Sequence, residues 1–254
     1  MGLTIKQPIN RASCLSSKSP FQLQGHLVKD FGYKNSHDNQ RDVASQAGVL
    51  KPYRAIGKRG FDILLALFLL PVLAPIIALF ILLIRRDGGP GLYSQERIGL
   101  KGQRFRCWKL RTMVQDAEQR LEELCALDTG IAREWREKQK LENDPRITPI
   151  GHFLRATSLD ELPQIFNVLL GDMSFVGPRP FMASQEPLYR EAGGTAYFSL
   201  RPGITGPWQV AARGQSDFLD RIHFDQNYLE QHSLGYDLKL MLQTVGVVVQ
   251  RTGH

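Results

Sequence analysis

Two neighbouring carboxylates, Asp160 and Glu161, lie in the stretch SLDELPQ and can be interpreted in two ways. In the first, Ser158 and Glu161 have the spacing of a capping box, in which the two side chains bond to amides at the start of a helix. Pro163 fits poorly inside such a helix, because proline lacks the N–H that a helix interior uses and prefers the first helical position. In the second, the helix starts at Pro163, and both carboxylates lie just ahead of its N-terminus as a reactive pair.

Basic residues lie on both sides of this pair, several of them framed by glycine or proline, as in VGPRP and LRPGITG. Glycine and proline fix backbone corners and allow the backbone to approach a ligand closely. Fixed basic groups beside an acidic pair suit a phosphate substrate with a divalent cation. Taken singly, each arginine could instead form an ordinary surface ion pair. The residues are Lys109, Arg111, Arg155, Arg179 and Arg201.

Several familiar site motifs are absent from the sequence. It has no Walker loop, no G-x-G-x-x-G motif and no G-x-S-x-G motif, so a bound nucleotide would be held in another way. Cys14, Cys107 and Cys125 are widely spaced, and no C-x-x-C or H-x-x-x-H pair occurs. This pattern argues against a disulfide framework or a zinc site and indicates a reducing compartment.

The net charge of +7 comes from the N-terminal part of the chain. Residues 1–60 contain ten basic and three acidic side chains, and the remainder is balanced. Residues 1–50 are rich in polar residues and contain few apolar residues in series, which predicts a disordered basic tail. No apolar stretch follows Met1, so we expect no cleaved signal peptide. We also expect no nucleic-acid partner.

A stretch of 22 uncharged residues, Ile63–Ile84, is the most apolar part of the chain. As a straight helix it would extend about 33 Å, which is enough to cross the core of a bilayer. Pro71 and Pro75 lie at its middle and basic residues flank both ends, and a helix-break-helix that enters the inner leaflet and returns would satisfy both observations. Because prolines are tolerated in spanning helices, sequence physics alone leaves the two alternatives nearly equal and slightly favours a single transmembrane helix.

The rest of the chain predicts an α+β fold that is mostly helical. LYSQERIG and RFRCWKLRT read as two strands around a turn at Gly99–Gly102. Residues 112–142 have a helical pattern that is interrupted near DTG, and a short helix follows from Gly151. The apolar segment 237–250 is too short to span a membrane, so it is either a buried core helix or an interfacial helix.

Four stretches carry a resemblance to a known family. KRGFDILLALFLL, GGPGLYSQERIGLKGQRFRCWKLRTM, DPRITPIGHFLRATSLDELPQIFNVLLGDMSFVGPRP and RPGITGPWQV resemble the bacterial sugar transferases. These are monotopic phosphoglycosyltransferases that prime the assembly of exopolysaccharides and other surface glycans. The resemblance runs in order from about Lys58 to the C-terminus and is most specific over 144–180. Because no multi-helix membrane domain precedes it, the chain resembles the short members, such as galactose phosphotransferases of exopolysaccharide pathways.

The resemblance implies a reaction and a location. Family members transfer a sugar-1-phosphate, with galactose or glucose expected here, from a UDP-sugar to undecaprenyl phosphate and release UMP, with Mg²⁺ as cofactor. It also implies a tail at 1–50, a re-entrant membrane hairpin at 51–86 broken at Pro75, and a cytosolic catalytic domain at 87–254. The enzyme would lie on the cytoplasmic face of the bacterial inner membrane against anionic lipid, with homodimerisation possible. A catalytically inactive membrane-anchored scaffold of the same fold is the competing hypothesis.

The resemblance also implies roles for individual residues. Asp160 matches the nucleophile that forms a phosphosugar-enzyme intermediate, and Glu161 matches a residue associated with Mg²⁺. Arg155 and Arg179 match phosphate-binding positions. The remaining basic residues in family motifs, whose roles are less defined, are Lys109, Arg111, Arg201 and Arg213.

Two positions depart from the family pattern. Ala74 stands before Pro75, where members often have serine, so hydroxyl assistance to the break is absent. Ala212 stands where glycine usually precedes the arginine, which leaves the loop geometry around Arg213 open.

Overall fold

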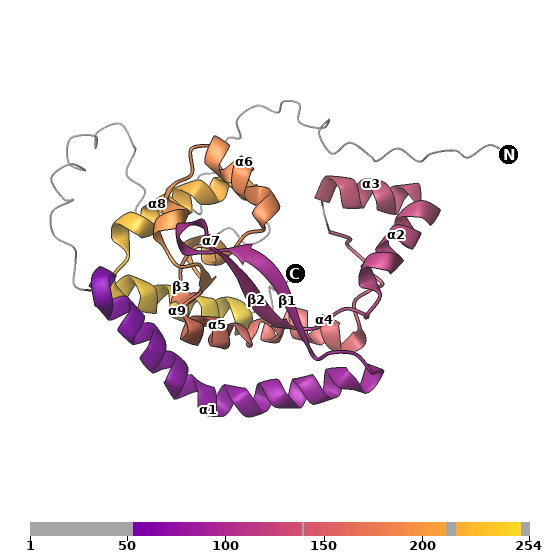
Figure 1. Cartoon of the computed structure of the whole chain (residues 1–254), viewed down its shortest axis with the longest axis horizontal. Helices are drawn as coiled ribbons and strands as arrows, with labels where there is room; N and C mark the ends of the chain where they lie inside the picture. Colours follow the sequence, from indigo (N-terminus) through magenta and orange to yellow (C-terminus); the bar gives the residue numbers. More distant parts are fainter. Residues whose placement is uncertain (1–52, 139, 212–216, 250–254) are drawn as a thin grey trace. The chain divides into compact units, whose positions relative to one another are not determined.

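The structure is a computed structural model that describes residues 53–138, 140–211 and 217–249. The predicted tail at 1–50, Ala212 and Arg213 lie outside these residues. Helices dominate the described chain, and its strands form two small two-stranded sheets, in agreement with the predicted α+β class (Figure 1). The helices are α1 (Lys58–Ile84), α2 (Ala117–Leu127), α3 (Thr129–Lys138), α4 (Pro149–Ala156), α5 (Gln164–Leu170), α6 (Glu186–Glu191), α7 (Pro207–Ala211), α8 (Arg221–Gln231) and α9 (Leu234–Val249).

The predicted β-hairpin is confirmed. Strands β1 (Leu92–Ile98) and β2 (Arg104–Leu110) pair antiparallel from Leu92↔Leu110 to Ile98↔Arg104. Lys101 and Gly102 both have positive φ, which closes the turn. Because side chains alternate between the two faces of a strand, residues that are paired across the hairpin share a face. One face therefore carries Tyr93, Gln95, Arg97, Phe105, Cys107 and Lys109.

The second sheet was not predicted. Strand β3 (Ser174–Val176) pairs parallel with β4 (Gly203–Thr205), which brings the VGPRP and RPGITG loops together. A Cβ atom on Gly203 would lie 2.1 Å from the backbone nitrogen of Gly177, so this approach requires glycine. The pairing places Arg179 at the end of β3.

The helix expected over 112–142 starts later than its pattern suggested. Residues 112–114 are not helical, because Val114 N–H donates to the Arg146 carbonyl at 2.9 Å and Thr148 N–H donates to the Thr112 carbonyl at 3.0 Å, and a turn at 115–116 precedes the helix. The interruption near DTG is confirmed. Helix α2 ends at Leu127, and the Asp128 side chain accepts the Gly130 N–H at 2.7 Å.

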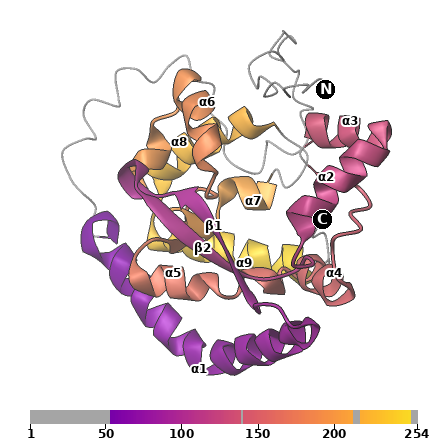
Figure 2. The ribbon, with the colours of Figure 1, turned by 45° about the vertical axis from the view of Figure 1, so that its right-hand side comes forward.

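The long apolar helix is continuous, and it bends. Helix α1 runs through Pro71 and Pro75 without a gap in its helical assignment, and its ribbon changes direction partway along (Figures 1 and 2). A complete break of the helix was expected at Pro75, whereas this structure has a bend in a continuous helix. Proline explains it, because the ring removes a backbone donor and clashes with the preceding turn. Among the described residues, Lys58–Asp87 is the one helical segment long and apolar enough to cross a membrane.

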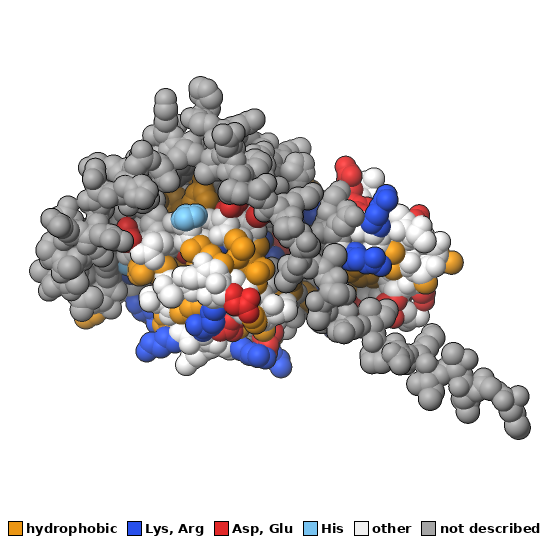
Figure 3. All heavy atoms as spheres, turned by 90° about the horizontal axis from the view of Figure 1, so that it is seen from above, with side chains coloured by type: hydrophobic (Ala, Val, Ile, Leu, Met, Phe, Trp, Pro, Cys, Tyr) orange, Lys and Arg blue, Asp and Glu red, His pale blue; other side chains and the backbone are white. Residues whose placement is uncertain are grey.

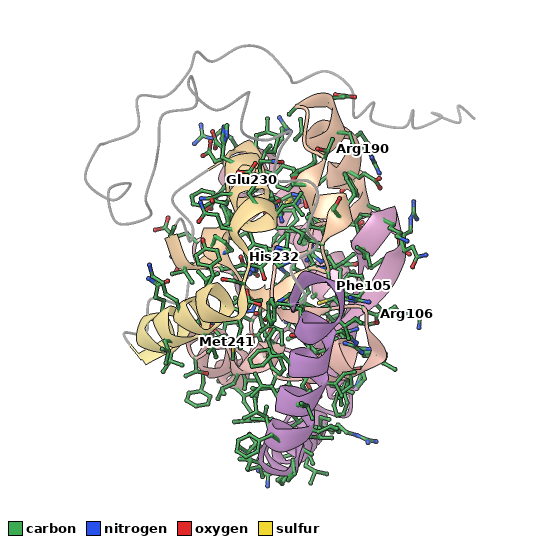
Figure 4. The ribbon with its side chains drawn as sticks, turned by 90° about the vertical axis from the view of Figure 1, so that its left-hand side faces the viewer. Phe105, Arg106, Arg190, Glu230, His232 and Met241 are labelled. Atoms are coloured by element: carbon green, nitrogen blue, oxygen red, sulfur yellow. The ribbon has the colours of Figure 1, made fainter. Side chains whose placement is uncertain are left out.

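A broad apolar surface accompanies this helix. Large hydrophobic side chains of α1, α4, α5 and α9 are exposed, while each of these helices also buries residues in the core. The exposed set also includes Phe166 of α5. Charged residues such as Arg190 and Glu230 lie away from the α1 side (Figure 4), and the view in Figure 3 shows charges of both signs. The main exposed members are Leu64, Phe68, Val72, Leu82, Phe153, Leu170, Leu242 and Val245.

Helix α9 combines the two alternatives left open for the C-terminal segment. Asp237 and Leu240 are fully buried, whereas Leu242 and Val245 on the same helix are 74% and 61% exposed. One face of the helix therefore packs in the core, and the other adds to the apolar surface.

Candidate active site

The acidic pair lies on a single 3₁₀ turn, Leu159–Glu161, between α4 and α5. Ser158 has a left-handed backbone with φ of 57° and forms no capping hydrogen bond through its side chain, so the capping-box interpretation is wrong. Pro163 is the N-cap residue of α5, as the second interpretation required. Both carboxylates therefore precede the helix instead of belonging to it.

Two basic residues from distant parts of the chain meet the pair. The Lys109 Nζ lies 2.8 Å from Glu161 Oε1 and 3.8 Å from Asp160 Oδ2. The Arg179 Nη2 lies 3.8 Å from the same Glu161 oxygen. The Asp160 and Glu161 side chains are only 13% and 19% exposed, so these charges interact in a partly desolvated setting. Strand β2, the 3₁₀ turn and the loop after β3 thus converge on one point.

Arg155 approaches the pair from α4. Burial lowers the pKa of the Arg155 guanidinium, and the charges of Asp160 and then Asp144 counteract this effect. Its Nε donates to Thr112 Oγ1 at 2.9 Å, which orients the guanidinium from the extended segment before α2. Arg155 therefore belongs to the same electrostatic neighbourhood as the nucleophile candidate.

The environment of Asp160 contains opposing influences. Burial raises the pKa of its carboxyl group, Lys109 and Arg155 lower it, and Glu161 raises it. A helix N-terminus alone would favour the ionised carboxylate, but here desolvation is the largest influence. The two basic neighbours therefore favour the ionised carboxylate and oppose the effect of burial on its pKa.

Two residues that sequence reasoning missed hold the site in place. Asn167 of α5 is fully buried, accepts the Trp108 N–H at 3.0 Å and donates to the Arg106 carbonyl at 2.7 Å, which ties α5 to the strand that carries Lys109. Arg221 of α8 donates to the Arg179 carbonyl and lies among several aromatic rings. The only signal for Asn167 was a polar residue within the apolar stretch QIFNVLL.

Other predicted site residues lie elsewhere. Arg111 is 7% exposed and donates to Asp87 Oδ1 at 2.5 Å and to the carbonyls of Pro90 and Ile84, so it fastens the end of α1. Arg201 donates to the Gly171 carbonyl at 2.9 Å, at the end of α5. The contacts of these two arginines in the structure are with Asp87 and backbone carbonyls, and a role for them in binding substrate stays a prediction.

A cleft of about 290 Å³ extends between Glu161 of the acidic pair and α1. Glu161 and Arg179 line it together with Leu73, which lies between the two prolines of α1. Most of its remaining lining is apolar and comes from α5, β3, β4 and α7. These side chains include Leu159, Leu162, Ile165, Phe175, Ile204 and Val210.

The acidic pair fits a magnesium ion only if a ligand completes the site. No group of three or more His, Cys, Asp and Glu side chains placed to hold a metal occurs in the described part of the chain. Mg²⁺ is, however, commonly held by one or two carboxylates together with substrate phosphates and water. Asp160 and Glu161 supply such a set, and the close Lys109 would share Glu161 with the ion.

Comparison with known proteins agrees with this geometry. The family model described as "Bacterial sugar transferase" matches residues 53–251. The "UDP-galactose-lipid carrier transferase" of Erwinia amylovora is 45% identical over 197 residues, which are 77% of this chain and 41% of that protein. The "Undecaprenyl-phosphate galactose phosphotransferase" of Salmonella typhimurium is 43% identical with the same coverage.

A third relative is similar in length. The "Exopolysaccharide production protein ExoY" of Sinorhizobium fredii is 39% identical over 212 residues, which are 83% of this chain and 93% of that protein. This chain thus spans about two fifths of the length of the first two relatives and nearly the whole length of the third. The family match covers α1, the hairpin, the acidic pair and the VGPRP and RPGITG loops. The chain belongs to the bacterial sugar transferase family.

Proposed function

We propose that this protein transfers a sugar-1-phosphate from a UDP-sugar to undecaprenyl phosphate as a membrane step of exopolysaccharide synthesis. The observation that carries the proposal is the position of the acidic pair. Glu161 lines a cleft that is mostly apolar and reaches Leu73 of α1, and Asp160 lies beside Glu161 among Lys109, Arg155 and Arg179. Such a site suits a phosphate donor and an acceptor with a long hydrocarbon stem. The names of two relatives specify galactose, so UDP-galactose is the first donor to test.

The chemistry needs two displacements at one phosphorus atom. In the first, an Asp160 oxygen attacks the phosphorus that bears the sugar, and the bond from this phosphorus to the bridging oxygen breaks, so that UMP leaves with the electron pair. In the second, an oxygen of undecaprenyl phosphate attacks the same phosphorus and releases the Asp160 carboxylate. An ionised carboxylate needs no general base, and Lys109 and Arg155 favour that form.

Positive charge around the pair lowers the barrier to both displacements. A diphosphate repels an incoming carboxylate, and Lys109, Arg155 and Arg179 offset this repulsion and stabilise charge that develops in the transition state. Glu161, with the substrate phosphates, would hold Mg²⁺, which when bound neutralises further phosphate charge. The partly buried position strengthens these interactions, because little water screens them.

We also propose that α1 enters and leaves the membrane on the cytoplasmic side. Asp62, near its start, accepts hydrogen bonds from Ser174 Oγ at 3.0 Å and Phe175 N–H at 3.1 Å. At its other end, Arg111 donates to the Ile84 carbonyl and to Asp87. Both ends are therefore tied to the same folded unit, whereas a spanning helix separates its ends by a bilayer. The exposed apolar side chains of α4, α5 and α9 support burial in one leaflet.

Labelling from one side of the membrane tests this topology. Ile56→Cys and Arg86→Cys place thiols at exposed positions just before and after α1, in a background without Cys14 and Cys125. In inside-out vesicles a membrane-impermeant maleimide should label both variants equally, and in sealed cells it should label neither. Labelling of the two positions from opposite sides would instead establish a single-pass helix.

Release of UMP tests the reaction. Purified protein in lipid nanodiscs with UDP-galactose or UDP-glucose, Mg²⁺ and undecaprenyl phosphate should release UMP continuously. Without the acceptor, release should stop after about one equivalent, because the enzyme then holds the sugar phosphate. EDTA should suppress turnover, and added Mg²⁺ should restore it. A catalytically inactive scaffold would release no UMP from any UDP-sugar.

A further inference from the structure

Arg97 is a basic residue of the hairpin that has been given no role so far. It pairs with Phe105, while Gln95 pairs with Cys107 and Tyr93 with Lys109. Arg97 and Lys109 therefore project from the same face of the hairpin. Since Lys109 contacts both carboxylates, this face runs from the acidic pair toward the turn.

The Arg97 side chain extends back along β1, in the direction of the acidic pair. Its Nη2 donates to Gln95 Oε1 at 2.5 Å, so the guanidinium turns back along β1, away from the turn. Gln95 Nε2 in turn lies 3.6 Å from the Met182 Sδ. Met182 follows Arg179 closely, so Gln95 joins this hairpin face to the loop that carries Arg179.

The buried thiol of Cys107 lies within the same group of charges. Burial raises its pKa, Lys109, Arg97 and Arg179 lower it, and Glu161 raises it. Charged groups that all shift the pKa of one buried thiol must lie near that thiol, because electrostatic interactions weaken with distance. Arg97 therefore shares a neighbourhood with Lys109, Arg179 and Glu161.

Arg97 lacks a carboxylate partner in the described chain. Its side-chain hydrogen bond goes to a neutral amide, and no Asp or Glu of residues 53–138, 140–211 or 217–249 forms an ion pair with it. Burial lowers the pKa of its guanidinium, and the nearby Arg179 lowers it further. By contrast, Arg104 of the same hairpin pairs with Glu96 at 3.0 Å. A half-buried arginine that faces a second arginine is stabilised when an anion binds between them.

We infer that Arg97 and Arg179 bind the phosphate that remains on the nucleotide when the donor is cleaved. This inference rests on the proposed function, in which Lys109 and Arg155 act on the phosphate that is transferred. Arg97 lies four strand positions from Tyr93, the partner of Lys109, or about 13 Å along the strand. The hydrogen bond to Gln95 directs the Arg97 guanidinium back along β1 toward Lys109, on the side where a donor held at the acidic pair would carry its second phosphate.

Paired hairpin variants test the inference. Arg97→Gln should raise the KM for the UDP-sugar at least about tenfold, because it removes charge-assisted hydrogen bonds to phosphate, while the KM for undecaprenyl phosphate stays unchanged. The affinity for UMP, measured by isothermal titration without turnover, should fall by a similar factor. Arg97→Lys should recover part of both losses. Arg104→Gln, on the opposite face and in an exposed ion pair, should change neither.

The outcomes separate this inference from the proposed reaction. If the wild type releases UMP but Arg97→Gln keeps its donor KM and UMP affinity, the inference fails and the reaction stands. If the wild type binds UMP through Arg97 but cleaves no UDP-sugar, the reaction fails and the binding position stands. A variant with lower thermal stability and lower kcat at unchanged donor KM would show a structural role for Arg97. A wild type that binds no UMP would also overturn the inference.

Discussion

Asp160→Asn should reduce UMP release from a UDP-sugar by at least about a thousandfold, since an amide cannot displace UMP and the loss of a nucleophile typically has effects of this size or larger. The substitution nearly preserves the shape of the side chain. Asp160 also forms only a long contact with Lys109, at 3.8 Å, whereas the closer partner of Lys109 is Glu161, at 2.8 Å. We therefore expect the variant to fold and to remain membrane-bound, with its thermal stability close to that of the wild type.

The proposed covalent step can be tested directly with a donor radiolabelled in the sugar. In the absence of undecaprenyl phosphate, the wild type should retain label on the polypeptide after denaturation, and Asp160→Asn should retain none. Glu161→Gln is the matched control, because it alters the neighbouring carboxylate and leaves the nucleophile in place. It should acquire label more slowly, and its deficit should depend on the Mg²⁺ concentration. Normal turnover in Asp160→Asn would contradict the covalent mechanism.

Local features of this fold were predictable because neighbouring residues determine them. The hairpin follows from alternating side chains on either side of the Gly99–Gly102 turn. The start of α5 follows from Pro163, whose missing N–H fits a helix end better than a helix interior. In both cases the determining residues lie within a few positions of the structure that they specify.

Pairings between distant segments were not predictable in this way. Strands β3 and β4 have three residues each, and neither carries a pattern of its own. They form because Gly177 and Gly203 let two loops approach, which depends on the rest of the fold. The bend of α1 shows the same limit, since a proline weakens a helix locally but packing decides whether the helix breaks or bends.

The candidate site shows why residue types alone are insufficient. Arg111 and Arg179 are both arginines within the family motifs, yet Arg111 donates to backbone carbonyls at the end of α1 while Arg179 lies beside Glu161. The family resemblance singled out Arg179 as a phosphate-binding position and left Arg111 undefined. Asn167 was missed because its function is to connect α5 with β2, a contact that the sequence does not display.

The start of α1 is held by a buried carboxylate on α9. Asp237 is fully buried, and its Oδ2 accepts hydrogen bonds from Tyr53 at 2.6 Å and from Lys58 Nζ at 2.7 Å. Its Oδ1 accepts a third bond from Tyr228, also at 2.7 Å. The Lys58 side chain is only 14% exposed, so both charges are largely withdrawn from water. This group joins the beginning of the membrane helix to the C-terminal helix, far along the chain.

Asp237→Leu should lower the free energy of unfolding by about 3 kcal/mol, because the largely buried Lys58 loses the carboxylate that it contacts and keeps the longer-range attraction of Asp62 alone. Denaturation by urea in mild detergent, followed by circular dichroism, measures the loss. The matched control is the double variant Lys58→Met with Asp237→Leu, in which neither charge remains and most of the stability should return. In both variants the Tyr228 hydroxyl can still donate to the Val176 carbonyl, so the loss of its bond to Asp237 contributes equally to the stability of each. Equal destabilisation of the single and double variants would show that the hydrogen bonds of Asp237 to tyrosine, and not its ion pair with Lys58, hold the start of α1 in place.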